Sequence, residues 1–315
     1  MSIKKHLTNS LIMVPPTHFK FNDETGVDNE FQQTIALPND EIQQRAMSEF
    51  NTMVERLTAQ GIQIIKLESE LKNDLNECKS PDAVFPNNWF STSCEGDIIL
   101  YAMATENRQT EIDLDLLTAQ LLKNNFIVNQ VREIGSREKK QFIEGTGVII
   151  FDHHNDSFYA ALSKRCDETL LKDYAEITHT KKNITFNTLS NSGSEIYHTN
   201  VMLSVGEDFA VVCDEVIIDA DREKVIESLS IKKDVIKISE KQMQHFCGNI
   251  LQIENDQGCK FIAMSSSAYA AFTDQQKVTL ERHGTLLSFN IPTIETIGGG
   301  SVRCMLAENF LPLKK

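Results

Sequence analysis

The sequence lacks the features that would divide it or attach it to a membrane. It has only seven prolines in 315 residues, and no stretch rich in glycine, serine or proline is long enough to be a linker. The apolar run at residues 11–14 is far shorter than the hydrophobic region of a signal peptide, and no later run approaches a membrane span. We therefore expect one large domain over residues 1–315, in the cytoplasm and with no membrane partner.

Paired cysteines are also missing. The seven cysteines are odd in number and widely spaced, without a C-x-x-C pair: Cys78, Cys94, Cys166, Cys213, Cys247, Cys259 and Cys304. This pattern argues against a disulfide framework and against a zinc site. The neighbouring His153 and His154 fall in a predicted hairpin turn, and no H-E-x-x-H spacing occurs. We therefore expect no metal and no cofactor.

Positive charge is scarce. Lys and Arg number 31 against 45 Asp and Glu, which gives a formal net charge of -14. Binding to phosphates requires a basic face, so this balance disfavours nucleic acid and anionic membrane surfaces as partners. A small cationic substrate is compatible with it, as is assembly into a homo-oligomer.

Hydrophobic periodicity repeats one order of elements along the chain. Each unit reads as two strands flanking a turn, then a helix, then a third strand, with a period of roughly 50 to 57 residues. The predicted elements are strands 89–93 and 98–103, helix 110–125 and strand 126–131; strands 147–151 and 157–162, helix 167–177 and strand 184–188; strands 201–205 and 209–213, a helix from Asp219 to residue 230 and strand 234–239; and strands 250–254 and 260–265, a helix capped by Thr273 and Gln276 that ends near Gly284, and strand 286–291.

The two ends of the chain supply a fifth unit. Residues 302–310 read as a strand, 11–16 as its hairpin partner, 38–61 as a helix and 62–67 as the third strand. Five such units in a ring, closed by the two ends, would cover each helix with a sheet and leave few free sheet edges. We therefore predict an α/β fold with a pseudo-five-fold repeat, a five-bladed α/β propeller.

Residues with chemical potential precede the first strand of successive units. They are Asp82, Glu144, His198, Cys247 and Cys304. Equivalent positions in a pseudo-symmetric ring converge on one end of its axis, so these side chains are predicted to share a pocket. A thiol, an imidazole and two carboxylates suit nucleophilic catalysis, and a carboxylate pair matches the planar donors of a guanidinium group. The glycines at 298–300 allow a ligand to approach Cys304 closely, which favours it over Cys247 as the nucleophile.

Several motifs together resemble a known superfamily. "EGTG" at 144–147 followed by "FYAALSKR", the "YHTN" block and a glycine-rich loop leading to a cysteine are similar to the guanidino-group modifying enzymes. These include arginine deiminase, dimethylarginine dimethylaminohydrolase and the amidinotransferases, and they adopt the five-bladed pentein fold. "MVPPTHFKFNDETGVDNEFQ", "DAVFPNNW", "YHTNVM" and "GGGSVRCMLAE" look closest to the bacterial arginine deiminase-related or citrulline-utilisation hydrolases.

The resemblance implies a role for each matching residue. Cys304 matches the nucleophile that forms a covalent intermediate, His198 the general acid and base, and Glu144 the carboxylate that positions the histidine or binds the guanidinium. The substrate-binding set implied in the same way comprises Asp82 for the planar group, Asn88 and the segment from Asn22 to Asn29 at the pocket wall, and Arg108 for a substrate carboxylate.

Two positions depart from the arginine deiminase pattern. Asn200 stands where those enzymes have an aspartate two residues after the histidine, and Gly147 replaces the aspartate that ends their "EGGD" motif. An amide is uncharged and can donate a hydrogen bond, so Asn200 favours a ureido oxygen or a substituted guanidine over plain arginine.

The sequence therefore predicts a metal-independent hydrolase of a guanidino or ureido amino acid, with citrulline favoured ahead of arginine or methylarginine. Two alternatives stay open. An amidinotransferase would use the same Cys-His-Glu set with an amine in place of water. A non-catalytic pentein binding protein is the other, although the presence of Cys304, His198 and Glu144 and the acidic charge argue against it.

Overall fold

A computed structural model describes residues 6–68 and 80–314, so Cys78 lies outside the described residues. It contains five three-stranded sheets with one shared topology. In each sheet the central strand pairs antiparallel with the strand on one side and parallel with the strand on the other. The strands, by sheet, are β15 (Ala307–Glu308), β1 (Ser10–Met13) and β2 (Gln63–Lys66); β3 (Phe90–Thr92), β4 (Asp97–Tyr101) and β5 (Gln130–Ile134); β6 (Ile150–Asp152), β7 (Ser157–Ala161) and β8 (Lys182–Phe186); β9 (Leu203–Val205), β10 (Phe209–Val212) and β11 (Asp234–Lys237); β12 (Leu251–Glu254), β13 (Lys260–Ser265) and β14 (Thr285–Phe289).

A helix connects the two parallel strands of every sheet, as a parallel crossover requires. These helices are α1 (Asn39–Ala59), α3 (Leu114–Lys123), α5 (Glu168–Thr178), α6 (Asp219–Leu229) and α9 (Asp274–Glu281). In α1 the buried residues Ile42, Ala46, Phe50, Met53 and Leu57 follow one another three or four positions apart and form one apolar stripe. The predicted capping box of Thr273 and Gln276 is present at the start of α9. The order of elements in all five predicted units is thereby confirmed.

Strand β15 joins the two ends of the chain. Leu11 and Ile12 of β1 pair antiparallel with Glu308 and Ala307 of β15. The fifth unit is therefore built from both ends, as predicted. Among the described helices, none is both long and apolar enough to cross a bilayer.

The predicted boundaries are wrong where a strand was expected to begin directly at a unit's entrance. Residues 302–310 were expected to be one strand, but residues Val302–Met305 form the helical turn α11 and only Ala307–Glu308 are extended. Residues 147–149 and 201–202 likewise belong to or follow one-turn helices. Short apolar runs do not distinguish a buried strand from a buried helical turn, which is why periodicity misassigned them.

The strand predicted at 126–131 also begins later, at Gln130. Phe126 instead forms an isolated bridge with Leu313, and the Ile127 amide donates to the Pro312 carbonyl at 2.8 Å. These apolar residues therefore pack against the C-terminal segment before β5 starts.

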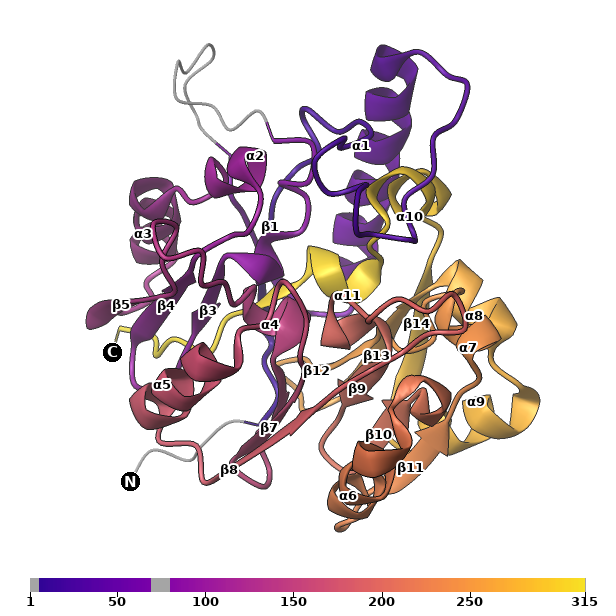
Figure 1. Cartoon of the computed structure of the whole chain (residues 1–315). Coiled ribbons are helices and arrows are strands. Elements are labelled where there is room, and N and C mark those ends of the chain that lie inside the picture. Colours follow the sequence, from indigo (N-terminus) through magenta and orange to yellow (C-terminus); the bar gives the residue numbers. More distant parts are fainter. Residues whose placement is uncertain (1–5, 69–79, 315) are drawn as a thin grey trace.

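One-turn helices at the unit entrances meet in the middle of the molecule. They are η1 (Pro86–Asn88), α4 (Gly145–Val148), η2 (Thr199–Val201) and α11 (Val302–Met305), which precede β3, β6, β9 and β15. Helix α4 contacts both η1 and η2, and α11 contacts η1. Figure 1 shows α4 and α11 near the centre, with the sheets arranged around them. The remaining short helices are α2 (Glu106–Gln109), η3 (Asp214–Val216), α7 (Glu240–Met243), α8 (Ser266–Ala271) and α10 (Pro292–Gly298).

Candidate active site

A cavity opens beside the entrance turns. Its walls contain the predicted site residues Asn29, Asp82, Asn88, Arg108, His198 and Cys304, together with Thr25, Phe85, Arg165, Tyr197, Gly298 and Gly300. The predicted residues Asn22, Glu144 and Asn200 do not line it but contact residues that do. The structure thus brings residues from the N-terminal segment and from four different units into one place.

The sulfur of Cys304 lies on α11 and is almost fully buried, with 4% exposure. Two amide groups face it: Asn249 Nδ2 at 3.2 Å and Asn200 Nδ2 at 3.5 Å. The Asn249 side chain is oriented by the Arg303 amide, which donates to Asn249 Oδ1 at 3.0 Å and so leaves the amide NH₂ toward the sulfur. The Cys304 sulfur also lies 3.6 Å from Asn249 Oδ1, so the two asparagine side chains fix the position of the nucleophilic atom.

The glycines before Cys304 are required by space and by backbone conformation. Gly299 has φ +62° and ends α10 in the left-handed region, where glycine is preferred. A Cβ atom on Gly298 or Gly300 would lie 2.8 Å from the ring of Phe85. The glycines therefore let this loop pass close to Phe85 in the cavity wall.

His198 is held by Glu144, which lies at the entrance of the preceding unit. The Nε2 atom of His198 lies 2.7 Å from Glu144 Oε2, and both residues are buried. A carboxylate accepts, so Nε2 carries the proton and Nδ1 is left as a base. Burial lowers the pKa of His198, although Glu144 partly offsets this, so the imidazole is neutral near pH 7.

Glu144 is ionised despite its burial. Burial alone would raise its pKa, but Arg165 and His198 more than offset this and hold the pKa far below its ordinary value. Arg165 Nη1 lies 3.1 Å from Glu144 Oε1, and the Ala104 amide donates to the same oxygen at 2.9 Å. Both Glu144 oxygens are thus engaged, which makes it an orienting group for His198.

Asp82 presents a free carboxylate oxygen. Its Oδ2 accepts from Asn22 Nδ2 at 2.7 Å and from Thr25 Oγ1 at 2.8 Å. Its Oδ1 is buried and has no hydrogen-bond partner among residues 6–68 and 80–314. Burial raises the pKa of Asp82, and Arg108 only partly offsets this. A cationic ligand at this position would supply the charge that the buried carboxylate lacks.

Arg108 lies in the cavity wall with its donors engaged. Its Nε and Nη2 each donate to Glu111 at 2.9 Å, Nη1 donates to Asn88 Oδ1 at 2.9 Å, and Nη2 also reaches the Phe85 carbonyl at 3.1 Å. Arg108 therefore fixes the position of Asn88. The amide nitrogen of Asn88 is buried and has no partner within the described part of the chain.

The N-terminal segment closes one side of the cavity. Asn29 donates to the Gly299 carbonyl at 3.3 Å, and Asn22 holds Asp82. Asp28 binds Arg165 through Oδ1 at 2.6 Å. This segment is therefore tied both to the glycine loop and to the Glu144 network.

Cys247 lies outside the cavity. Its sulfur is fully buried, faces the Ala268 carbonyl at 3.5 Å, and has its pKa raised to about 12 by burial. From the same turn it is Asn249 that reaches the site, a residue that sequence reasoning missed. Arg165 was missed as well, whereas Thr25 lies in the predicted segment from Asn22 to Asn29 and Tyr197 belongs to the "YHTN" motif. The Asn in "FCGNI" was visible as a polar residue at an entrance position, and Arg165 ends the "FYAALSKR" motif.

The departure at Gly147 has a structural cause. A Cβ atom there would lie 2.3 Å from Asn88 Nδ2 and 3.0 Å from His198 Nδ1. Any side chain at this position would displace both groups, so Gly147 is coupled to the presence of Asn88 and to the orientation of His198.

Comparison with known proteins identifies the fold and the family. A family model described as "N,N dimethylarginine dimethylhydrolase, eukaryotic" matches residues 15–311. No curated protein matches the chain.

Solved structures share the fold at low sequence identity. Full-length ArgZ, an arginine dihydrolase from the ornithine-ammonia cycle in cyanobacteria, matches with a TM-score of 0.71 and 16% identity over 97% of this chain, which spans 41% of ArgZ. A variant of the ArgZ N-terminal domain with a covalently bound reaction intermediate gives a TM-score of 0.70 and 18% identity over 96% of this chain and 99% of that domain.

A variant of dimethylarginine dimethylaminohydrolase, as the adduct with S-methyl-L-thiocitrulline, gives a TM-score of 0.64 and 12% identity over 96% of this chain and 100% of that protein. These likenesses confirm the predicted α/β fold, and the five mixed sheets are consistent with its five-fold repeat. The chain belongs to the N,N-dimethylarginine dimethylhydrolase family, within the pentein superfamily of guanidino-group modifying enzymes.

Proposed function

We propose that this protein hydrolyses a guanidino amino acid, arginine or an N-methylated arginine, through a covalent intermediate on Cys304. The observation that carries the proposal is the position of the Cys304 sulfur and the His198-Glu144 pair around one cavity with the free Oδ1 of Asp82. The family match supports guanidino chemistry in general.

The charges at the cavity support a cationic substrate. Arg108 is paired with Glu111, and Arg165 is paired with Glu144 and Asp28, so neither arginine contributes an uncompensated positive charge. Asp82 adds a buried carboxylate with one free oxygen. A guanidinium donates in a plane to such an oxygen and brings the opposite charge. A neutral ureido group would leave the burial of that charge uncompensated.

The reaction follows from the groups around the sulfur. The Cys304 thiol passes its proton to Nδ1 of His198 as the sulfur attacks the guanidino carbon, and His198 then delivers that proton to the departing nitrogen, so a C–S bond forms and a C–N bond breaks. Ammonia or an amine leaves. A water molecule then loses a proton to His198 and attacks the same carbon, the C–S bond breaks, and the ureido product leaves. Overall, a guanidinium and water give a ureido group and an ammonium ion.

The other residues of the site hold the reacting groups in position. Glu144 orients His198, Asn249 and Asn200 direct amide N–H groups at the sulfur, and Asp82 holds the planar group. Asn22 and Thr25 hold Asp82, and Asn29 holds the glycine loop. Arg108 supports the wall through Asn88. We therefore assign it a positioning role, in place of the predicted role of binding a substrate carboxylate.

Citrulline is a second candidate, favoured by one observation. The Asn200 amide lies 3.5 Å from the Cys304 sulfur, close enough to donate to a ureido oxygen on a carbon attacked by that sulfur. Hydrolysis of citrulline would yield ornithine, ammonia and carbon dioxide through a thiocarbamate. The argument against it is that its ureido group is neutral and would leave the charge of Asp82 uncompensated.

A substrate panel tests the proposal. Arginine, monomethylarginine, dimethylarginine and citrulline are each incubated with the protein, and ammonia, methylamines, citrulline and ornithine are measured by mass spectrometry. The proposal predicts citrulline and an amine from at least one guanidino substrate. Ornithine from citrulline alone would favour the second candidate, and product formed from arginine and glycine without release of ammonia would favour amidino transfer. No turnover of any of these substrates would contradict the proposal.

A further inference from the structure

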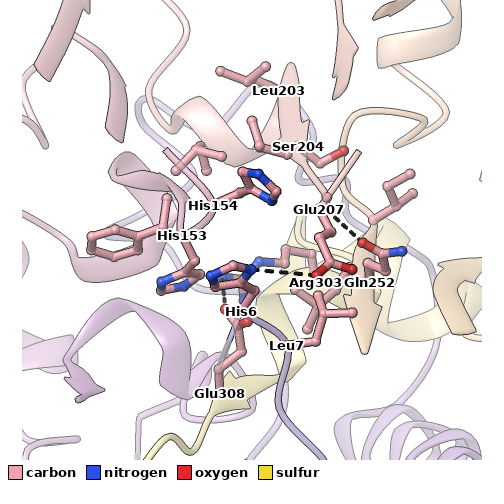
Figure 2. A pocket seen from close by; sticks show the side chains of 16 residues that line it. His6, Leu7, His153, His154, Leu203, Ser204, Glu207, Gln252, Arg303 and Glu308 are labelled. Carbon is pink, nitrogen blue, oxygen red and sulfur yellow. Dashed lines mark hydrogen bonds and ion pairs between the residues drawn. The ribbon is translucent and has the colours of Figure 1, made fainter. Parts of the chain in front are cut away.

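A second cavity shares α11 with the catalytic one. Cys304 lines the catalytic cavity, whereas its neighbour Arg303 lines the second. Figure 2 shows His6, His154 and Glu207 in this second cavity, together with Arg303 and Gln252. The proposed hydrolysis does not use these residues.

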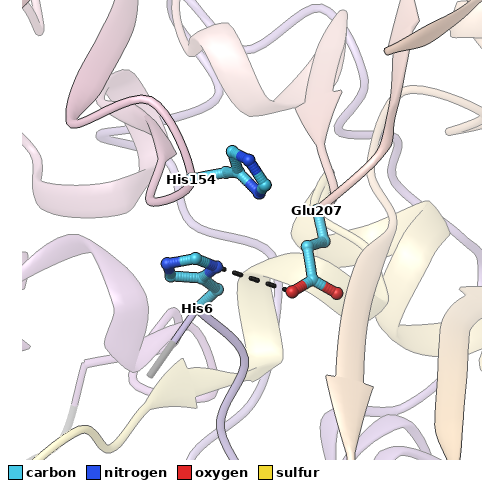
Figure 3. Close-up of side chains that lie close together, drawn as sticks. All are labelled: His6, His154 and Glu207. Atoms are coloured by element: carbon cyan, nitrogen blue, oxygen red, sulfur yellow. Dashed lines mark ion pairs between the residues drawn. The ribbon is translucent and has the colours of Figure 1, made fainter. Parts of the chain in front are cut away.

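Two imidazoles and a carboxylate converge there. One ligand atom from each of His6, His154 and Glu207 lies within 4.8 Å of the others. The Nδ1 atom of His6 is 3.5 Å from Glu207 Oε1, and the rings of His6 and His154 have centroids 5.2 Å apart. Figure 3 shows the three side chains pointing toward a common space.

This spacing matches a tetrahedral transition metal. Metal-ligand bonds of about 2.0 to 2.2 Å in a tetrahedral zinc site place neighbouring ligand atoms roughly 3.4 Å apart. The pair of His6 and Glu207 already has this separation. The third ligand, His154, is exposed on a turn, so rotation of its side chain can close the remaining distance.

The carboxylate is held in place by its surroundings. Glu207 lies in the turn between β9 and β10, and its amide donates to Gln252 Oε1 at 2.7 Å. Its Oε2 forms an ion pair with Lys260, which leaves Oε1 toward His6.

The other contributors are also anchored. His154 belongs to the β6–β7 turn, in which Asn155 donates to Asp152 through its amide at 3.2 Å and its side chain at 2.7 Å. The nearby cation Arg303 is neutralised by Glu308 at 3.0 Å. A divalent cation therefore meets no uncompensated positive charge from Arg303.

We propose that His6, His154 and Glu207 form a binding site for Zn²⁺, with the fourth coordination position open to solvent. Two imidazoles and one carboxylate are a donor set that zinc accepts and that Mg²⁺ and Ca²⁺, which prefer oxygen, do not. The bound ion would connect the segment before β1 to the β6–β7 and β9–β10 turns, and so join three units of the fold.

Zinc titration of the full chain tests the site. The protein carries Cys304→Ser so that the catalytic thiol does not bind the metal, and Zn²⁺ is titrated in competition with a chromophoric chelator. We expect one tight equivalent. His6→Ala, His154→Ala and Glu207→Gln should each weaken its affinity at least about tenfold.

His153→Ala is the matched control, because His153 occupies the same turn but stacks on Phe151 with a centroid distance of 5.2 Å. It should bind zinc like the parent. A melting temperature that Zn²⁺ raises in the parent and in this control, but not in His154→Ala, would support the site independently, and Mg²⁺ should raise none. Absence of a tight equivalent, or equal affinity in parent and His154→Ala, would overturn the proposal.

Discussion

At the scale of single residues, the central feature is the Cys304 sulfur, which faces the side-chain amides of Asn249 and Asn200. Asn249 is the closer donor to Cys304, at 3.2 Å, and its orientation depends on the Arg303 amide. A hydrogen bond to a group that gains charge during a reaction contributes about 1.5 to 3 kcal/mol, so the Asn249 amide should affect the attack by the Cys304 sulfur more than substrate affinity.

We predict that Asn249→Ala lowers the rate of Cys304 alkylation by iodoacetamide at pH 7 about tenfold or more, and lowers kcat by a similar factor with little change in KM. The measurement is alkylation of the Cys304 peptide followed by mass spectrometry, alongside steady-state kinetics. Cys247→Ala, in the same turn but outside the cavity, should leave both quantities near those of wild type. An Asn249→Ala protein with unchanged alkylation would refute this role.

Gly147 offers a steric test of the His198 orientation. In Gly147→Ala the new methyl group would meet Asn88 Nδ2 at 2.3 Å and His198 Nδ1 at 3.0 Å. Misplacing a catalytic base by about 1 Å costs on the order of 100-fold in rate, so kcat should fall by about this factor. Adding Asn88→Ala removes the shorter contact and should recover part of the loss. Wild-type kcat in the single variant would show that His198 tolerates displacement.

At the scale of elements, the helical turns before the first strands place the candidate catalytic side chains at the cavity. The run 302–310 was predicted as a strand because its apolar residues fit one, yet Val302–Met305 turn helically and bring Cys304 to the cavity. The entrance positions of Asp82, Glu144, His198 and Cys304 could be predicted from the repeat, since a repeat fixes equivalent positions. Arg165 and Asn249 could not, because their roles depend on distances between units that local periodicity does not contain.

Helix α10, which leads into the glycine loop, contains a carboxyl group that should titrate near neutral pH. Glu295 accepts from Ser301 Oγ at 2.6 Å. Burial, with a smaller contribution from Glu49, raises its pKa from 4.5 to about 7, against the opposing hydrogen bonds from Ser265 and Ser301. Glu49 also accepts hydrogen bonds from the backbone amides of Thr293 and Ile294 at the start of α10.

The raised pKa predicts how stability depends on pH. Because the folded state binds the Glu295 proton more tightly than the unfolded state, this contribution is complete below pH 4.5 and is lost as pH rises through about 7. Its size is about 3 kcal/mol. The free energy of unfolding in urea should therefore be measured for Glu295→Gln and wild type at pH 5 and pH 8. The variant's value minus the wild-type value should be larger at pH 8 than at pH 5. A difference independent of pH would contradict the assignment.

At the scale of the whole molecule, the pairing of β1 with β15 joins the two ends of the described chain next to Cys304. Leu11 is fully buried in this sheet and lies in one cluster with Cys304 and Met305. We expect Leu11→Ala to lower the free energy of unfolding by about 2 to 5 kcal/mol in urea titrations. Ile231→Ala, at a site 49% exposed, should change it by less than about 0.5 kcal/mol. Equal effects would show that closure of the fifth unit is not required for stability.

The five-unit order could be predicted from the sequence because each unit repeats the same hydrophobic periods. The metal-binding cluster could not, since His6, His154 and Glu207 come from three units and have no local spacing. The sequence argument against a metal site considered only neighbouring histidines and short motifs. Such an argument cannot detect ligands that come from turns far apart in the sequence.

The most direct test of the central claim is mass spectrometry of the protein quenched during turnover of arginine or methylarginine. We expect an amidino adduct on the peptide that contains Cys304, present in wild type and absent in Cys304→Ser, which should also lose turnover by several orders of magnitude. An adduct on Cys247, or turnover retained in Cys304→Ser, would contradict the claim that Cys304 is the nucleophile.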